Sequence, residues 1–150
     1  MPLPSEHRPP ELPGTQTHAH LVAAFARDAQ VSRLMDELAK LARIEGYPVA
    51  AKALTEMSET SSMVAAGHLD FLRRAGDPIE DAPLGGTPEN LAALTRIATV
   101  DVEEHLPAGA QTSVAEGFPD IASWFETVAA TRRGHLARLE TLLHAMKDTG

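Results

Sequence analysis

One stretch of this chain occurs twice, and the repetition limits the folds that the chain can adopt. EGYPVAAKALTEM at residues 45–57 aligns without a gap with EGFPDIASWFETV at residues 116–128. Each copy begins with Glu, Gly, an aromatic residue and Pro. Glycine readily takes the left-handed conformation that ends a helix, and proline favours the first turn of the next helix. The repeat therefore predicts two similar helical hairpins.

Long amphipathic segments flank both copies, with apolar residues at spacings of three and four. We expect helices over residues 17–45, 48–74, 87–116 and 119–147. Thr87 is the expected N-cap of the third helix, and Pro107 should kink that helix. No segment shows the alternation of a β-strand. The prediction is an all-α, antiparallel four-helix bundle over residues 17–147, made of two hairpins joined by a crossover loop.

Composition excludes several kinds of partner and cofactor. The chain has 150 residues, 43% of them hydrophobic, which suffices for one domain with a core. A net charge of −8 leaves no basic patch for nucleic acid, and no apolar tract approaches the length of a membrane span. The absence of cysteine excludes disulfides, Cys-ligated zinc and iron–sulfur clusters. Oxygen and nitrogen ligands are the ones that remain.

The first residues of the chain differ in composition from the rest. Residues 1–16 are rich in proline and lack the apolar core of a signal peptide. We therefore expect a flexible tail on a cytoplasmic protein.

Polar side chains interrupt the apolar stripe of each helix near its middle. Asp28 lies on the first helix, Ser61 on the second, Asp101 on the third, and Arg132 and His135 on the fourth. Burying such groups without partners costs a few kcal/mol each. Their common level in a bundle therefore predicts a central polar site.

These landmarks resemble the rubrerythrins. The resemblance rests on the EGY and EGF junctions, residues 25–30 (FARDAQ), Asn90-Leu91, Pro107, Ile121-Ala122, Phe125 and His135. It implies a ferritin-like four-helix bundle that binds two irons and reacts with peroxide or oxygen. In that family the four helices supply, in order, Glu, Glu-x-x-His, Glu-x-x-Glu and Glu-x-x-His.

The ligand positions of the family are mostly changed in this sequence. The resemblance places them, in order, at Asp28, Ser61 and Val64, Ala98 and Asp101, and Arg132 and His135. Three ligand-type side chains remain, Asp28, Asp101 and His135. Nowhere in the chain does Glu or Asp stand three residues before His, so a shifted register does not restore the set. The resemblance thus implies a degenerate diiron site.

Two interpretations of this remnant stay open. In the first, the Arg132 guanidinium pairs with Asp28 and Asp101, and His135 completes the hydrogen bonds. The protein then binds no cofactor and is a non-catalytic scaffold or binding protein. In the second, Asp28, Asp101 and His135 hold iron, manganese or zinc, and the protein is a peroxidase-like oxidoreductase that uses an outside reductant.

Two further features concern metals and partners. His68 and His105 lie one turn beyond the site level on their helices, and His20 opens the first helix. They are either an alternative metal cluster or core histidines bonded to neighbours. Trp124 beside the Phe125 stripe indicates a dimer contact. We expect a homodimer with an unidentified protein or small-molecule partner.

Overall fold

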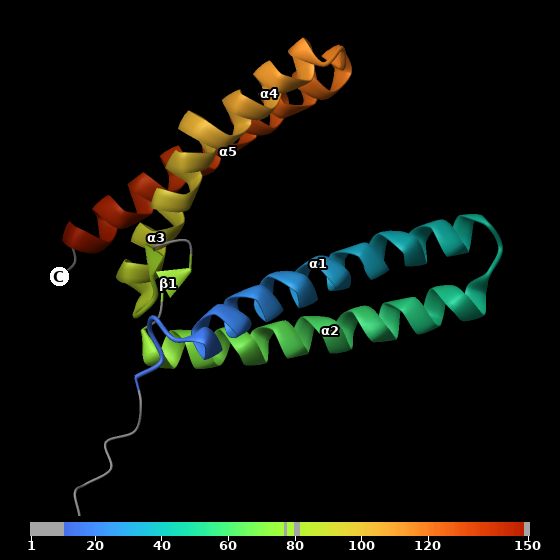
Figure 1. Cartoon of the computed structure of the whole chain (residues 1–150), viewed down its shortest axis with the longest axis horizontal. Coiled ribbons are helices and arrows are strands. Elements are labelled where there is room, and N and C mark those ends of the chain that lie inside the picture. The colour runs from blue at the N-terminus through green and yellow to red at the C-terminus, as the bar shows by residue number, and fades with distance from the viewer. Residues whose placement is uncertain (1–10, 77, 80–81, 149–150) are drawn as a thin grey trace, which may run out of the picture. The chain divides into compact units, whose positions relative to one another are not determined.

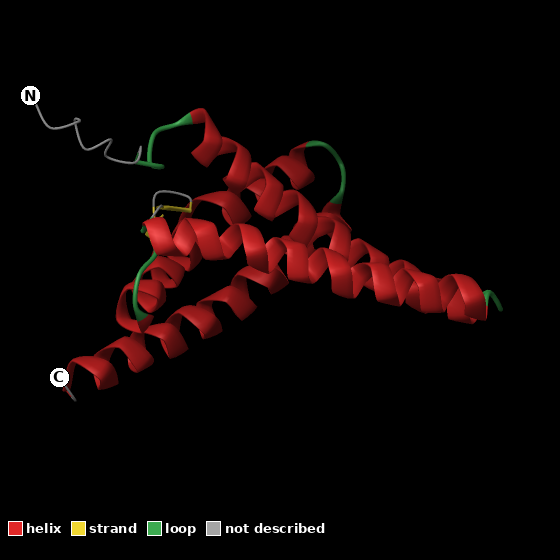
Figure 2. Cartoon of the chain, turned by 90° about the horizontal axis from the view of Figure 1, so that it is seen from below, coloured by secondary structure: helices red, strands yellow, loops and turns green. Residues whose placement is uncertain are grey.

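Helices form nearly all of the described part of the chain, as Figures 1 and 2 show. The computed structural model describes residues 11–76, 78–79 and 82–148. The chain divides into two compact units, Met1–Asp77 and Pro78–Gly150. The first unit contains α1 (Gln16–Ile44) and α2 (Pro48–Ala75). The second contains β1 (Pro78–Ile79), β2 (Ala82–Pro83), α3 (Thr87–Val100), the π-helical turn η1 (Asp101–His105), α4 (Leu106–Ala115) and α5 (Pro119–Asp148).

The predicted fold class, all-α and ferritin-like with two similar helical hairpins, is confirmed. Figure 1 shows α1 and α2 side by side along their length, and α4 and α5 side by side in the second hairpin. The third predicted helix is one helical segment made of α3, η1 and α4. None of the described helices is long and apolar enough to cross a membrane.

Two local expectations are wrong. β1 and β2 form a small antiparallel ladder, with Ile79 opposite Ala82, where no strand was expected. Strands of two residues are too short to show alternation in a sequence. The N-cap of α3 is Gly86, one residue before Thr87. The Asn90 side chain supports this start, because its oxygen accepts from the Gly85 N–H at 2.8 Å and its amide donates to the Gly85 carbonyl at 3.0 Å.

The start of α1 lies inside the predicted Pro-rich tail. Residues 1–10 of that tail are outside the described residues. Thr15 is the N-cap of α1, and its hydroxyl oxygen accepts from the His18 N–H at 3.0 Å. This bond satisfies one of the free N–H groups of the first turn. The domain boundary at residue 17 stays a prediction.

The two copies of the repeat form the same hairpin turn. Gly46 and Gly117 have φ of 84° and 87°. The Tyr47 N–H donates to the Ala42 carbonyl and the Phe118 N–H to the Ser113 carbonyl, each at 2.8 Å. A left-handed glycine with this six-residue hydrogen bond is the Schellman motif, which satisfies carbonyls at a helix end. The similar sequences of the two turns therefore adopt the same backbone geometry.

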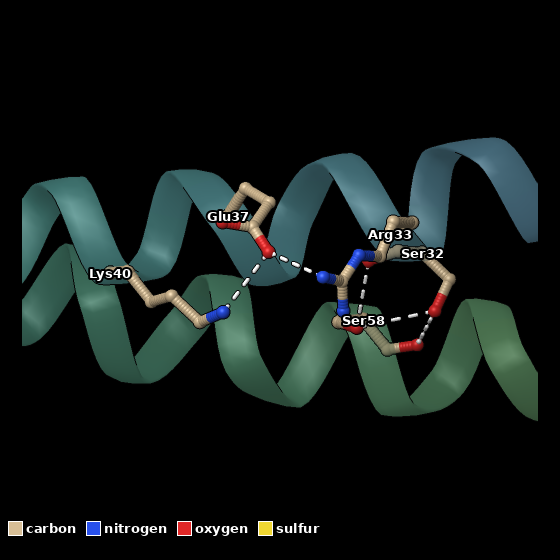
Figure 3. Close-up of polar contacts among 5 residues, drawn as sticks. All are labelled: Ser32, Arg33, Glu37, Lys40 and Ser58. Atoms are coloured by element: carbon tan, nitrogen blue, oxygen red, sulfur yellow. Dashed lines mark hydrogen bonds and ion pairs between the residues drawn. The ribbon is translucent and has the colours of Figure 1, made fainter. Parts of the chain in front are cut away.

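A seam of small side chains joins α1 to α2. The most buried residues of α2 recur every seven positions: Ala51, Ser58, Ala65 and Leu72. Ser58 is 3% exposed and faces Ser32 of α1 (Figure 3). The Ser58 hydroxyl donates to the Ser32 carbonyl at 2.9 Å, and the Ser32 hydroxyl donates to the Ser58 carbonyl at 3.0 Å. Small residues at this spacing let the two backbones approach closely, and the reciprocal bonds satisfy the buried hydroxyls.

Charged residues line the solvent side of the same hairpin. Glu37 accepts from Lys40 at 3.0 Å and pairs with Arg33 at 2.8 Å, so that its carboxylate lies between two cations (Figure 3). The hydrogen bond from Lys40, followed by the charge of Lys40 and of Arg33, lowers the pKa of Glu37. Because these groups are exposed, they add to solubility more than to stability.

The second hairpin packs on small residues as well. Ala122 and Ala129 of α5 are buried, again seven positions apart, and Ser113 of α4 is buried. A side chain at Gly109 would meet the Phe125 ring at 3.3 Å. Glycine at this position therefore makes room for the aromatic ring.

The hairpin turn can be tested by changing its glycine. Gly46→Ala is expected to destabilise the protein by about 1 kcal/mol, because alanine avoids the left-handed conformation. Gly67 inside α2 is the matched control, since a Cβ there meets nothing within 4 Å. Gly67→Ala should stabilise the helix by about 0.5–1 kcal/mol. Urea unfolding followed by circular dichroism measures both changes, and effects of the same sign would contradict the assignment.

The seam can be tested by enlarging its buried serine. Ser58→Leu is expected to lower the free energy of unfolding by about 1–3 kcal/mol, because the seam has no room for the larger side chain. Ser62→Leu, on an exposed position of the same helix, should stay within about 0.5 kcal/mol of the parent. If urea unfolding gives equal stability for both variants, the close approach of α1 and α2 at Ser58 is wrong.

Candidate functional site

Asp28 and His68 form a polar pair between the two helices of the first hairpin. The Asp28 Oδ2 and His68 Nε2 atoms are 2.8 Å apart, which is hydrogen-bonding distance. The side chains are 31% and 26% exposed, so both are partly removed from water. The sequence assigned these residues to two different candidate sites, whereas the structure makes them partners.

The candidate site in the second hairpin begins at an irregular helical turn. The π-helical turn η1 runs from Asp101 to His105, and the Leu106 N–H donates to the Asp101 carbonyl. Pro107 follows directly and has no N–H to donate. The irregularity expected at Pro107 therefore takes the form of an inserted residue just before it. Such turns are frequent at functional sites.

The Asp101 side chain contacts two neighbours. Its Oδ1 atom lies 3.0 Å from His105 Nδ1, one turn along the helical segment. Its Oδ2 atom lies 3.6 Å from Arg132 Nε of α5, an ion pair longer than a good hydrogen bond. Arg132 thus lies beside one of the two carboxylates expected for it. The other carboxylate, Asp28, has His68 as its partner, and the bridging of both acids by Arg132 stays a prediction.

His135 lies in a groove between α3 and α5. The groove has a volume of about 340 Å³ and is lined by Leu94, Ile97, Ala98, Arg132, His135, Arg138, Leu139 and Leu142. His135 has no hydrogen bond or ion pair among the described residues. The hydrogen bonds expected of His135 stay a prediction. The apolar lining agrees with the predicted apolar stripes of these helices, whereas Arg138 is a residue that the sequence prediction did not name.

The other candidate residues are divided between the two units. Ser61 and Val64 are on α2, and neither side chain supplies a metal ligand of the expected kind. His20 is exposed on α1, while His105 belongs to the second unit. Among residues 11–76, 78–79 and 82–148, no group of three His, Asp or Glu side chains converges on a point. The three-histidine cluster stays a prediction.

These residues do not fit a diiron centre. Two irons need several carboxylates that are free to bind metal. Here Asp28 is hydrogen-bonded to His68, and Asp101 contacts both His105 and Arg132. Arg132 also places a permanent positive charge next to Asp101, which repels a metal cation.

Comparison with known proteins gives two informative relatives. The chain is 30% identical over 141 residues to the rubrerythrin of Porphyromonas gingivalis, covering 90% of this chain and 70% of the relative. It is 29% identical over 145 residues to rubrerythrin-1 of Clostridium acetobutylicum, covering 91% of this chain and 74% of the relative. No family model matches the chain.

The Asp28–His68 pair can be tested by a double-mutant cycle. Asp28→Ala, His68→Ala and the double variant should give a coupling energy of about 1 kcal/mol, as for a partly buried hydrogen bond. The control cycle uses Lys52 and Glu56, an exposed pair on α2 separated by 3.9 Å. Its coupling should be close to zero. Equal coupling in the two cycles, measured by urea unfolding at pH 7, would show that Asp28 and His68 do not interact.

Proposed function

This chain belongs to the rubrerythrin family, and we propose that it is a member whose diiron site has degenerated, so that it acts as a non-catalytic binding or scaffold protein. In this proposal the protein has the helical framework of the family and lacks its metal chemistry. Function follows the residues of a site more closely than the fold that carries it.

The observation that carries this proposal is that both remaining carboxylates contact other side chains of the protein. Asp28 and Asp101 are the acids left at the ligand positions, and each is engaged by basic or imidazole side chains of the protein. A metal would have to displace these partners before it could bind. At Asp101, charge compensation by Arg132 therefore takes over the role that a metal cation has in the family.

Arg132 has a particular part in the proposal. It stands where the resemblance expects an acidic ligand, and its guanidinium lies 3.6 Å from Asp101. The Arg132 side chain is 39% exposed, so the ion pair contributes less than about 1 kcal/mol to stability. The substitution is thus better explained by charge compensation at the old site than by a gain in stability.

We also propose that the working form is a homodimer in the cytoplasm. Trp124 is 63% exposed on α5, and the neighbouring Phe118 and Ile121 are exposed as well. Aromatic residues on a helix flank are enriched at protein interfaces. This patch near the second hairpin turn supports a contact between two copies.

The central test is iron loading of the purified protein. After anaerobic addition of ferrous iron, removal of the excess and exposure to air, elemental analysis should find well under one iron per chain. The absorption spectrum should lack an oxo-bridged diiron band. Arg132→Glu, which removes the cation and adds a carboxylate, should bind more iron than the parent, and Arg132→Gln serves as the control without the added acid.

Two other results would redirect the proposal. Near two irons per chain with an oxo-bridged band would show that the site is functional and that the protein is a metal-dependent oxidoreductase. One bound metal per chain that is lost in Asp101→Asn or His135→Ala would favour a mononuclear site with the reduced ligand set.

A further inference from the structure

The methionines that the structure describes differ in their contact with solvent. Met63 of α2 is 68% exposed, more than any other described methionine. Met57 is 46% exposed, and Met35 and Met146 are half-buried. Met1 lies outside the described residues. The Met63 side chain thus contributes little to packing, and its polarisable thioether is accessible to small molecules.

Met63 lies on the outward side of α2. It is five residues from Ser58 of the buried seam and five residues from His68, the partner of Asp28. Five residues correspond to about 140° around a helix, so the Met63 side chain points away from both. Met57 is eleven residues from His68, about three full turns, and shares the face that the sequence predicts to meet the bundle axis. Met63 is therefore the exposed methionine of α2 that a complete bundle leaves in solvent.

The helix surface next to Met63 is open as well. Gly67 lies one turn further along α2, and residues four apart are neighbours on a helix surface. A Cβ at Gly67 would meet nothing within 4 Å, so that open space borders this side of the helix. Gly67 itself has no side chain that could shield the Met63 sulfur. A small oxidant can therefore approach the thioether from solvent.

We propose that Met63 is a surface oxidation site at which the protein consumes hydroperoxides. A lone pair of the sulfur attacks one oxygen of hydrogen peroxide, so that an S–O bond forms and the O–O bond breaks. The hydroxide that leaves takes the proton of the transferred hydroxyl and becomes water. The sulfur loses two electrons, which the peroxide gains, and methionine sulfoxide is formed. The step needs no metal, so the inference is independent of the proposed function.

Oxidation at this position is compatible with the fold. A sulfoxide is polar, and it disrupts apolar cores when it forms inside them. At Met63 the new oxygen lies in water, so that no packing is lost. Met35 and Met146 are half-buried, and their oxidation would place a polar group against other side chains. Met63 thus reacts with peroxide before oxidation reaches methionines that pack.

The experiment is treatment of the metal-free full-length protein with excess hydrogen peroxide, with a chelator present to exclude iron-catalysed radical oxidation. Peptide sequencing by mass spectrometry gives the rate of sulfoxide formation at each methionine. Met63 should be oxidised about threefold faster or more than the other described methionines, because susceptibility follows exposure. Urea-unfolded protein is the control, and there the rates should become similar.

Two leucine variants assign the fast reaction to its residue. Met63→Leu should remove the fast phase of sulfoxide formation, whereas Met57→Leu should keep it. Leucine is close to methionine in volume, so that both variants should fold, which circular dichroism checks. Protein oxidised at Met63 alone should keep the urea midpoint of the unoxidised protein.

Several outcomes would overturn the assignment of Met63. They are equal or faster oxidation of another described methionine, a fast phase that persists in Met63→Leu, and a lowered urea midpoint after oxidation at Met63 alone. Much slower oxidation of Met63 in folded than in unfolded protein would also overturn it, because a protein surface, a second copy included, would then cover this side of α2. Iron uptake by the parent protein would instead overturn the proposed function, so the two failures are distinguishable.

Discussion

The close approach of paired helices along seams of small side chains is the constraint on which the other features of each hairpin depend. In the first hairpin, Ser58 is buried against Ser32, and each hydroxyl donates to the backbone carbonyl of the other residue. Larger side chains at these positions would separate the helices. The same close approach of the helices continues away from the hairpin loop. Asp28 of α1 and His68 of α2 lie at least four helical turns from that loop, and their Oδ2 and Nε2 atoms are 2.8 Å apart. The polar pair is thus a consequence of the packing along the seam.

In the second hairpin, a local irregularity combines with the packing. The π-helical turn before Pro107 inserts one residue, and Asp101 lies at its first position. From there the carboxylate contacts His105 along the same segment and Arg132 across the hairpin. Every remaining acid of the family's ligand positions therefore has protein partners.

Sequence reasoning recovered the elements of the fold and missed the packing surface inside the hairpins. The duplicated glycine–aromatic–proline junctions predicted both turns, since left-handed glycine and a following proline are local properties. The sequence analysis placed Ser61 on the apolar stripe of the second helix but did not identify the buried seam of α2, which consists of Ala51, Ser58, Ala65 and Leu72. Small size at a seven-residue spacing is the signal in the sequence that identifies the seam.

The sequence by itself determined the helices, their turns, the all-α class and the identity of the residues at the positions that the resemblance assigns to metal ligands, among them Ser61, Val64, Ala98 and Arg132. These follow from local backbone preferences and from residue identity, which need no knowledge of neighbours. Only the tertiary structure decided which charged groups pair: Asp28 with His68, and Asp101 with His105 and Arg132. It also decided that Arg138 joins His135 at an apolar groove. Such pairings depend on how closely two helices approach and on their rotation about their axes, and both are set by packing between residues far apart in the chain.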